Sequence, residues 1–113
     1  MGSGLPKKEN FAYYRNVPLV DRWYVYIARC SDGSLYTGIA KDVAARLAAH
    51  DAGKGARYTR GRGPLTFHAK KRCDSKGEAL RLELAVKALN PKEKSELSDS
   101  ESFRSFARRV RIV

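Results

Sequence analysis

Two short runs of aromatic and β-branched residues, separated by a tight turn, place the strongest constraint on the fold of this chain. Residues 23–30 (WYVYIARC) and 35–39 (LYTGI) have the composition of strands. The residues between them include Asp32-Gly33, a pair that favours hairpin turns. Since side chains alternate along a strand, the odd-numbered residues of the first run should face one side of the sheet and the even-numbered residues the other. The segment predicts an antiparallel hairpin.

Patterns further along the chain predict a third strand and more helices. Residues 42–51 form a helix that Asp42 can cap, and residues 65–73 have the composition of a strand. The helix expected over residues 75–89 begins with a capping-box pattern, in which the glutamate reaches back to the N-cap backbone. A proline opens a short helix over residues 91–97. The order is β-β-α-β-α-α, an α+β fold with a small three-stranded antiparallel sheet flanked by helices.

The domain predicted from these elements covers residues 21–98. Residues 1–20 show no period and begin with Met-Gly-Ser-Gly, so we interpret them as an N-terminal arm or the remnant of a tag. Residues 99–113 form a basic C-terminal tail, in which Phe103 and Phe106 have the spacing of a short amphipathic helix. Because a polar linker precedes this helix, we expect loose attachment, so that its deletion weakens ligand binding and spares the fold.

The charge of the chain narrows the choice of partner. Lys and Arg number 23 against 12 Asp and Glu, and the formal net charge is +11. Such an excess repels itself in the folded state and is typical of proteins that bind nucleic acid. A basic protein without such a partner is the alternative. A membrane is less favoured, because the cations form no single block and no apolar run approaches the roughly 20 residues that span a bilayer.

The two cysteines give no sign of a metal site but bear on the cellular compartment of the protein. Cys30 and Cys73 lack the spacing of a metal-ligand pair, and no signal peptide is recognisable. We therefore expect reduced thiols in a cytoplasmic protein, with a disulfide between them as the alternative.

Five residues are candidates for a functional site. Tyr26 and Tyr36 lie on the two strands of the hairpin, where tyrosine is also an ordinary strand residue. Arg46 and His50 are four residues apart and share one face of the predicted helix, which by itself is consistent with a solvated face. Glu83 lies in an apolar stretch of its helix. A buried carboxylate is costly unless a metal ion, an arginine or another structural ion pair supplies a partner.

The order and spacing of these residues resemble the GIY-YIG nuclease superfamily, in particular its small stand-alone bacterial members. Tyr24-Val25-Tyr26 stands where the family has GIY, and Tyr36-Thr37-Gly38 where it has YIG. Residues 42–50 resemble the helix that carries an arginine and often a histidine. Residues 78–83 resemble the helix that carries a metal-binding glutamate. The resemblance covers residues 22–98 and implies a metal-dependent endonuclease acting on nucleic acid, with DNA as the favoured substrate and branched or damaged DNA as candidates.

The resemblance also implies a role for each candidate. Glu83 would hold Mg²⁺ or Mn²⁺ together with the substrate phosphate, which Arg46 would bind. Tyr26 would be the general base towards the attacking water. Tyr36 would position that water or the phosphate, and His50 would orient Tyr26 or share its proton. Since tyrosine ordinarily titrates near pH ~10, cationic or metal-bound surroundings would have to lower the pKa of Tyr26.

A glycine-rich basic loop, residues 53–63, follows the first predicted helix. It resembles the basic loop of the small bacterial members, and its cations are spaced so that they can follow a nucleic-acid backbone, with a tyrosine among them that can stack on a base. A solvated basic turn is the alternative. The residues expected to contact nucleic acid are Lys54, Arg57, Tyr58, Arg60 and Arg62.

A non-catalytic nucleic-acid-binding module with the same fold is the alternative function. Some family members carry an active-site asparagine one helix beyond the glutamate, where this chain has Ser95, and the first glycine of GIY is Tyr24 here. We favour the nuclease because a glutamate in the phosphate path of a mere binding protein would repel the ligand. The two tyrosines, the arginine and the glutamate should then converge on one concave face of the sheet.

Overall fold

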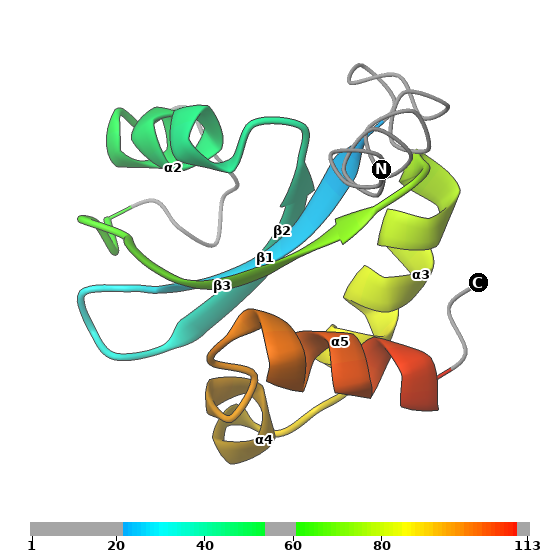
Figure 1. The fold of residues 1–113 in the computed structure, drawn as a ribbon. Coiled ribbons are helices and arrows are strands. Elements are labelled where there is room, and N and C mark those ends of the chain that lie inside the picture. Colours follow the sequence, from blue (N-terminus) through cyan, green and yellow to red (C-terminus); the bar gives the residue numbers. More distant parts are fainter. Residues whose placement is uncertain (1–21, 54–60, 111–113) are drawn as a thin grey trace, which may run out of the picture.

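The computed structural model describes residues 22–53 and 61–110, which form a three-stranded sheet with helices packed around it (Figure 1). The strands are β1 (Trp23–Arg29), β2 (Leu35–Ala40) and β3 (Thr66–Cys73); the helices are α2 (Val43–Asp51), α3 (Lys76–Lys87), α4 (Pro91–Ser95) and α5 (Ser100–Arg109). The α+β class and the predicted strands and helices are confirmed. The expected N-terminal arm lies outside the described residues.

The sheet has the order β2-β1-β3, and both neighbouring pairs are antiparallel. The central strand β1 pairs with β2 through the predicted hairpin, in a register that places Tyr26 opposite Gly38 and Ala28 opposite Tyr36. In the turn, Gly33 has a φ of 87°, which is favoured by glycine because it has no Cβ. The hairpin register therefore brings the two predicted motif tyrosines to adjacent strands.

Short side chains begin the helices as predicted, with one exception. Asp42 accepts a hydrogen bond from the Ala45 N–H at 3.0 Å and caps α2. The Ser75 hydroxyl accepts from the Glu78 N–H at 3.1 Å and caps α3. The predicted return contact to the N-cap backbone is wrong, because the Glu78 carboxylate accepts instead from the N–H of Asp74, one residue earlier.

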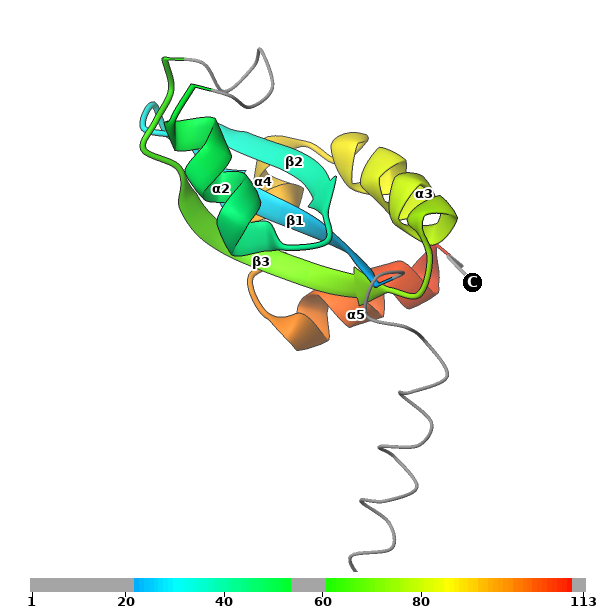
Figure 2. The same cartoon turned by 90° about the horizontal axis from the view of Figure 1, so that it is seen from above.

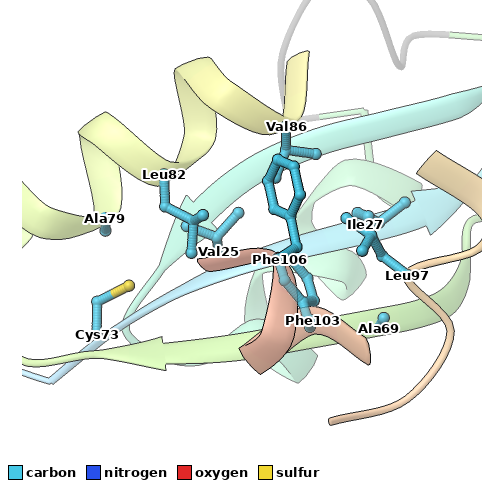
Figure 3. Packing of buried hydrophobic residues seen from close by; sticks show 10 residues of the cluster. All are labelled: Val25, Ile27, Ala69, Cys73, Ala79, Leu82, Val86, Leu97, Phe103 and Phe106. Atoms are coloured by element: carbon cyan, nitrogen blue, oxygen red, sulfur yellow. The ribbon is translucent and has the colours of Figure 1, made fainter. Parts of the chain in front are cut away.

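One face of the sheet packs against α3 and α5 and forms the larger apolar core (Figure 3). Figure 3 shows residues of β1 and β3 meeting side chains from both helices. The cluster consists of Val25, Ile27, Ala69, Cys73, Ala79, Leu82, Val86, Leu97, Phe103 and Phe106. Because the odd-numbered residues of β1 face this core, the predicted alternation is confirmed.

The other face of the sheet packs against α2, which lies on the opposite side from α5 (Figures 1 and 2). Its buried cluster consists of Tyr26, Ala28, Cys30, Ala40, Val43 and Leu65, with Tyr24, Tyr36 and Leu47 packed against it. This second core contains the motif tyrosines, so the sheet separates an apolar face from a face that carries titratable side chains.

The C-terminal helix is part of the core, and the prediction of a loosely attached tail is wrong. Phe103 is fully buried and Phe106 is 7% exposed, both within the larger cluster. The polar residues before them start the helix, because Asp99 and Ser102 form a reciprocal capping box. The predicted amphipathic helix is present, and its apolar face packs on the sheet.

The two cysteines are buried free thiols in different clusters, one on each face of the sheet. Burial raises the pKa of the Cys73 thiol to about 11. This thiol therefore remains protonated, and weakly nucleophilic, at neutral pH.

Candidate active site

The phenol ring of Tyr26 lies over Gly38, its partner in the neighbouring strand. A Cβ atom at position 38 would lie 2.7 Å from the Tyr26 hydroxyl oxygen and 3.0 Å from Cε2 of Tyr36. Both approaches are closer than van der Waals contact allows. Gly38 therefore leaves the space that the two tyrosine rings occupy, and any side chain there would push against both.

Tyr26, Tyr36 and His50 form a compact aromatic group. The Tyr26 hydroxyl lies 2.9 Å from Nε2 of His50, a buried hydrogen bond that joins β1 to α2. The ring of Tyr36 meets the His50 ring edge-on at a centroid distance of 5.2 Å and lies 6.2 Å from the Tyr26 ring. Three of the five predicted site residues are thus in direct contact.

Burial and neighbouring charge raise the pKa of Tyr26 to about 12. Desolvation is the main cause, followed by the Tyr36 hydroxyl, while the Arg46 guanidinium opposes the shift by its charge and by a hydrogen bond. The cationic surroundings do not lower this pKa by themselves, because burial outweighs the arginine; that a bound metal ion lowers it stays a prediction. Tyr26 therefore keeps its proton at neutral pH.

His50 is a neutral hydrogen-bond partner of the Tyr26 hydroxyl. Burial lowers the pKa of His50 and the charge of Arg46 lowers it further, with a smaller opposing effect from Asp51, so the ring is neutral at pH 7. A guanidinium can only donate, so the Tyr26 oxygen accepts from Arg46. With the Nδ1–H tautomer of the neutral ring, the hydroxyl donates to Nε2 of His50.

Glu83 reaches the same group from α3, which lies beside the edge strand β2 (Figure 2). Its negative charge raises the pKa of both Tyr26 and Tyr36, which places it within electrostatic range of the two hydroxyls. The structure therefore brings Tyr26, Tyr36, Arg46, His50 and Glu83 together between α2 and α3.

Lys87 is a site residue that the sequence reasoning missed. Its ammonium lies 3.2 Å from the Glu83 carboxylate, whose side chain is only 15% exposed. Lys87 is also the strongest charge acting to lower the pKa of Tyr36, which burial nevertheless keeps above its usual value. The spacing of four residues from Glu83, a favourable geometry for opposite charges on a helix, was the available signal.

A basic hollow of about 300 Å³ opens beside Tyr36. Lys87 and Lys94 line it together with residues of β2. Thr37 lines the same hollow, and its Oγ1 is a buried polar atom without a hydrogen-bond partner in the part of the chain that the structure describes. The two lysines make this hollow suitable for an anionic group next to the tyrosines.

The remaining predicted residues lie elsewhere or outside the described ranges. Arg62 forms an ion pair with Asp32 at 2.8 Å, which ties the basic loop to the β1–β2 turn. Ser95 donates its hydroxyl to the Lys92 carbonyl within α4, and Asn90 caps that helix through the Glu93 N–H. The other residues expected to contact nucleic acid, Lys54, Arg57, Tyr58 and Arg60, fall outside the described residues.

Comparison with known proteins shows the family of this chain. The family model of the GIY-YIG catalytic domain matches residues 22–96, and the chain belongs to this family. It is 51% identical over 73 residues to a UPF0213 protein of Cupriavidus pinatubonensis, covering 65% of this chain and 81% of that protein. A UPF0213 protein of Halobacterium salinarum is 49% identical over 74 residues, covering 66% of this chain and 96% of that protein.

A solved structure is also similar. The solution NMR structure of a UPF0213 protein from Bacillus halodurans is 50% identical in sequence, with a TM-score of 0.44. The match covers 67% of this chain and 81% of that one.

Proposed function

We propose that this chain is an endonuclease that hydrolyses phosphodiester bonds in nucleic acid, DNA in the first place, with the help of a divalent metal ion. The observation that carries the proposal is the buried hydrogen bond between Tyr26 and His50 under the charges of Arg46 and Glu83. A buried tyrosine–histidine pair beside an exposed guanidinium combines a proton pathway with a phosphate ligand.

The phosphate is held by the cations that surround the tyrosines. Arg46 is exposed on α2 and presents the planar fork of donors that matches phosphate oxygens. Lys87 and Lys94 line the hollow on the other side of Tyr36. The scissile group therefore lies over the tyrosines, with positive charge on both sides to offset the charge that develops on its oxygens.

Tyr26 and His50 move the proton of the attacking water. Because Tyr26 is protonated at neutral pH, its oxygen can take a proton from water only as its own proton passes to Nε2 of His50. The water oxygen then forms the new bond to phosphorus, the bond to the leaving oxygen breaks, and that oxygen takes a proton from solvent. Tyr36 is placed to orient the water or the phosphate.

The residues fit a metal ion that is shared with the substrate. The part of the chain that the structure describes contains no group of three or more histidine, cysteine, aspartate or glutamate side chains that could hold a metal ion. A single hard oxygen ligand from Glu83 suits Mg²⁺ or Mn²⁺, which keep most of their waters and bind substrate phosphate as well. The ion supplies Lewis-acid stabilisation of phosphate charge.

A second candidate function, a nucleic-acid-binding module without catalysis, is favoured by one observation. Lys87 already neutralises Glu83 in the protein alone, so the carboxylate has a structural partner and need not hold a metal ion. In this case the net charge of +11 still attracts nucleic acid, and the tyrosines are packing residues of the second core.

Cleavage of a substrate panel tests the proposal. Duplex, flap and junction DNA and the matching RNAs are incubated with the chain and Mg²⁺, Mn²⁺ or a chelator. We expect metal-dependent cleavage that Tyr26→Phe and Arg46→Ala abolish, while Arg104→Ala, which removes an exposed cation from α5, remains active. Absence of cleavage on every substrate, with nucleic-acid binding retained, would instead support the binding module.

The setting of this activity is also a proposal. No helix among residues 22–53 and 61–110 is long and apolar enough to cross a membrane. We place the protein in the cytoplasm, acting on branched or damaged DNA in repair, with the basic loop around Arg62 contributing to binding. Affinity for DNA should fall steeply as salt rises, because cations held near the DNA are released on binding.

A further inference from the structure

A second hollow adjoins the candidate active site at Arg46. It has a volume of about 540 Å³, is open to solvent and lies where the end of β2 meets the first turns of α2 and α3. Its lining includes Trp23, Lys41, Arg46 and Lys76. The mechanism proposed above uses only the arginine of this set, so the remaining residues call for a separate explanation.

Two lysines from different segments gather on one tryptophan ring. The ammonium groups of Lys41 and Lys76 each lie 5.2 Å from the centroid of the Trp23 ring, within the range of cation–π attraction. Trp23 is half-buried at the start of β1, with part of the ring accessible from the hollow. The result is an aromatic platform with positive charge at its borders.

The charge of this hollow is strongly one-sided. Three cations line it against one carboxylate, that of Asp42, and one oxygen of this carboxylate accepts a hydrogen bond from the Ala45 N–H. Lysine ammonium groups on flexible stems can leave the ring face for a phosphate while the indole remains in place. The hollow thus combines the two features of single-strand binding sites, an aromatic surface for stacking and cations for the backbone.

We infer that this hollow binds an unpaired nucleotide next to the scissile phosphate. Its base stacks on Trp23, and its flanking phosphates bind Lys41 and Lys76. The inference rests on the proposed function, because Arg46 lines both the hollow and the cluster that would hold the scissile phosphate. A paired base within a duplex has both faces covered by its neighbours, so only an unstacked base can use the indole.

This inference selects a class of substrate. Flaps, overhangs and locally melted strands present an unpaired nucleotide beside the cut, and a perfect duplex does not. Both hollows lie along the edge strand β2: Ile39 lines this one and Leu35 lines the hollow of Lys87, about 13 Å apart at the usual strand rise.

The test uses intrinsic fluorescence, because Trp23 is the only tryptophan of the chain. The full chain is titrated, in the presence of a chelator, with a short single-stranded deoxyoligonucleotide, with a blunt-ended duplex of two complementary strands of the same composition and with polyglutamate. We expect strong quenching by the single strand and little by the other two. Trp23→Ala should weaken single-strand affinity by about 5- to 150-fold, the range for loss of one stacked base, and Trp23→Phe should restore most of it.

Matched charge variants separate this hollow from general electrostatic attraction. Lys41→Ala and Lys76→Ala should each weaken single-strand binding more than Lys92→Ala, an exposed lysine on α4 that does not line the hollow. Trp23 packs against the larger core, so the loss of its ring can prevent folding. If Trp23→Ala does not fold, the single-strand affinity of Trp23→Phe and the fluorescence quenching of the wild-type protein test the inference.

Several results would overturn the inference. One is that the duplex or polyglutamate quenches the fluorescence as strongly as the single strand does. Another is that none of the three quenches it. A third is an unchanged single-strand affinity in a folded Trp23→Ala protein. The fluorescence is read without cleavage. A protein that stacks bases but cuts nothing therefore contradicts the proposed function alone, and one that cuts DNA without quenching contradicts only this inference.

Discussion

The Tyr26 hydroxyl and Nε2 of His50 are 2.9 Å apart, and the two side chains are 0% and 3% exposed. This contact links the central strand to α2, which is otherwise a helix with few buried residues. The same two groups thus connect the stability of the second core with the proton pathway proposed for catalysis. The pH dependence of unfolding can therefore report on these two groups without any substrate.

His50→Gln should reduce the loss of stability at acid pH. Burial lowers the pKa of His50 in the folded protein, while the unfolded chain binds the proton near pH 6.5. The stabilisation is therefore complete above about pH 6.5 and is lost as pH falls through the folded pKa. Denaturant unfolding from pH 4 to 8 measures this slope. His68→Gln leaves the Tyr26–His50 pair intact and should keep the pH dependence of the wild-type protein. Equal slopes in the wild type and both variants would contradict the assignment of this pH dependence to His50.

Gly38→Ala should destabilise the protein by about 1–3 kcal/mol, the usual cost of overpacking a core. The new methyl carbon would lie 2.7 Å from the Tyr26 oxygen, so the phenol must move and its bond to His50 must lengthen. Gly77→Ala is the matched control, because its Cβ meets nothing closer than 3.7 Å within α3 and should stabilise by about 0.5–1 kcal/mol. Thermal unfolding distinguishes the two, and equal stability changes would show that the tyrosine is freer than its contacts indicate.

Glu83→Gln should abolish cleavage while changing stability by less than about 1 kcal/mol. The Lys87 partner is half-exposed, and pairs of this kind contribute little. Binding of nucleic acid should be equal or tighter, because a negative charge beside the phosphate is removed. Lys87→Met, which removes the other half of the pair, is the control for stability alone and should also change the free energy of unfolding by less than about 1 kcal/mol. A loss of about 3–5 kcal/mol in Glu83→Gln, together with an uncleaved substrate panel in wild type, would make Glu83 a structural residue.

Phe103→Ala should destabilise the protein by about 3–5 kcal/mol, the cost of a large cavity in a core. The phenyl ring is fully buried between α5 and the sheet. Arg108→Ala on the exposed side of the same helix should change the unfolding midpoint little. Urea titrations compare the two variants, and a wild-type midpoint for Phe103→Ala would reinstate the loosely attached tail.

Thr37→Val should stabilise the protein. The Thr37 hydroxyl is buried and has no hydrogen-bond partner among residues 22–53 and 61–110, so it carries a desolvation cost of about 1–3 kcal/mol that an isosteric methyl group avoids. Thr66→Val, at an exposed strand position, is the matched control and should have little effect. If Thr37→Val is destabilising, the hydroxyl has a role in the neighbouring hollow, which a comparison of oligonucleotide affinity for the two proteins would reveal.

Local patterns predicted the fold because each element has its own signal. The turn pair Asp32-Gly33 and the strand composition around it determine the hairpin, and small polar residues at the helix starts determine α2 and α3. The burial of α5 was not predictable in this way. An amphipathic pattern shows that a helix has an apolar face, and the partner of that face depends on chain segments far away in the sequence.

The candidate site was predicted residue by residue through the family pattern, but its electrostatics were not. The pKa of Tyr26 depends on how completely the phenol is buried, which spacing does not show, and burial raises this pKa although Arg46 is close. Lys87 was overlooked although its position relative to Glu83 was visible, because a lysine four residues after a glutamate is common on exposed helix faces.

The division of the sheet into two unlike faces has a consequence for engineering. Val25 and Ile27 of β1 belong to the apolar core, and the even-numbered residues of the strand belong to the face with the tyrosines. Directed evolution can therefore raise thermostability through Val25, Ile27 and their helix partners without altering the side chains on the reverse of the same strand. A library restricted to these two positions would search for robustness, and one restricted to the even positions would vary the face that carries the candidate site.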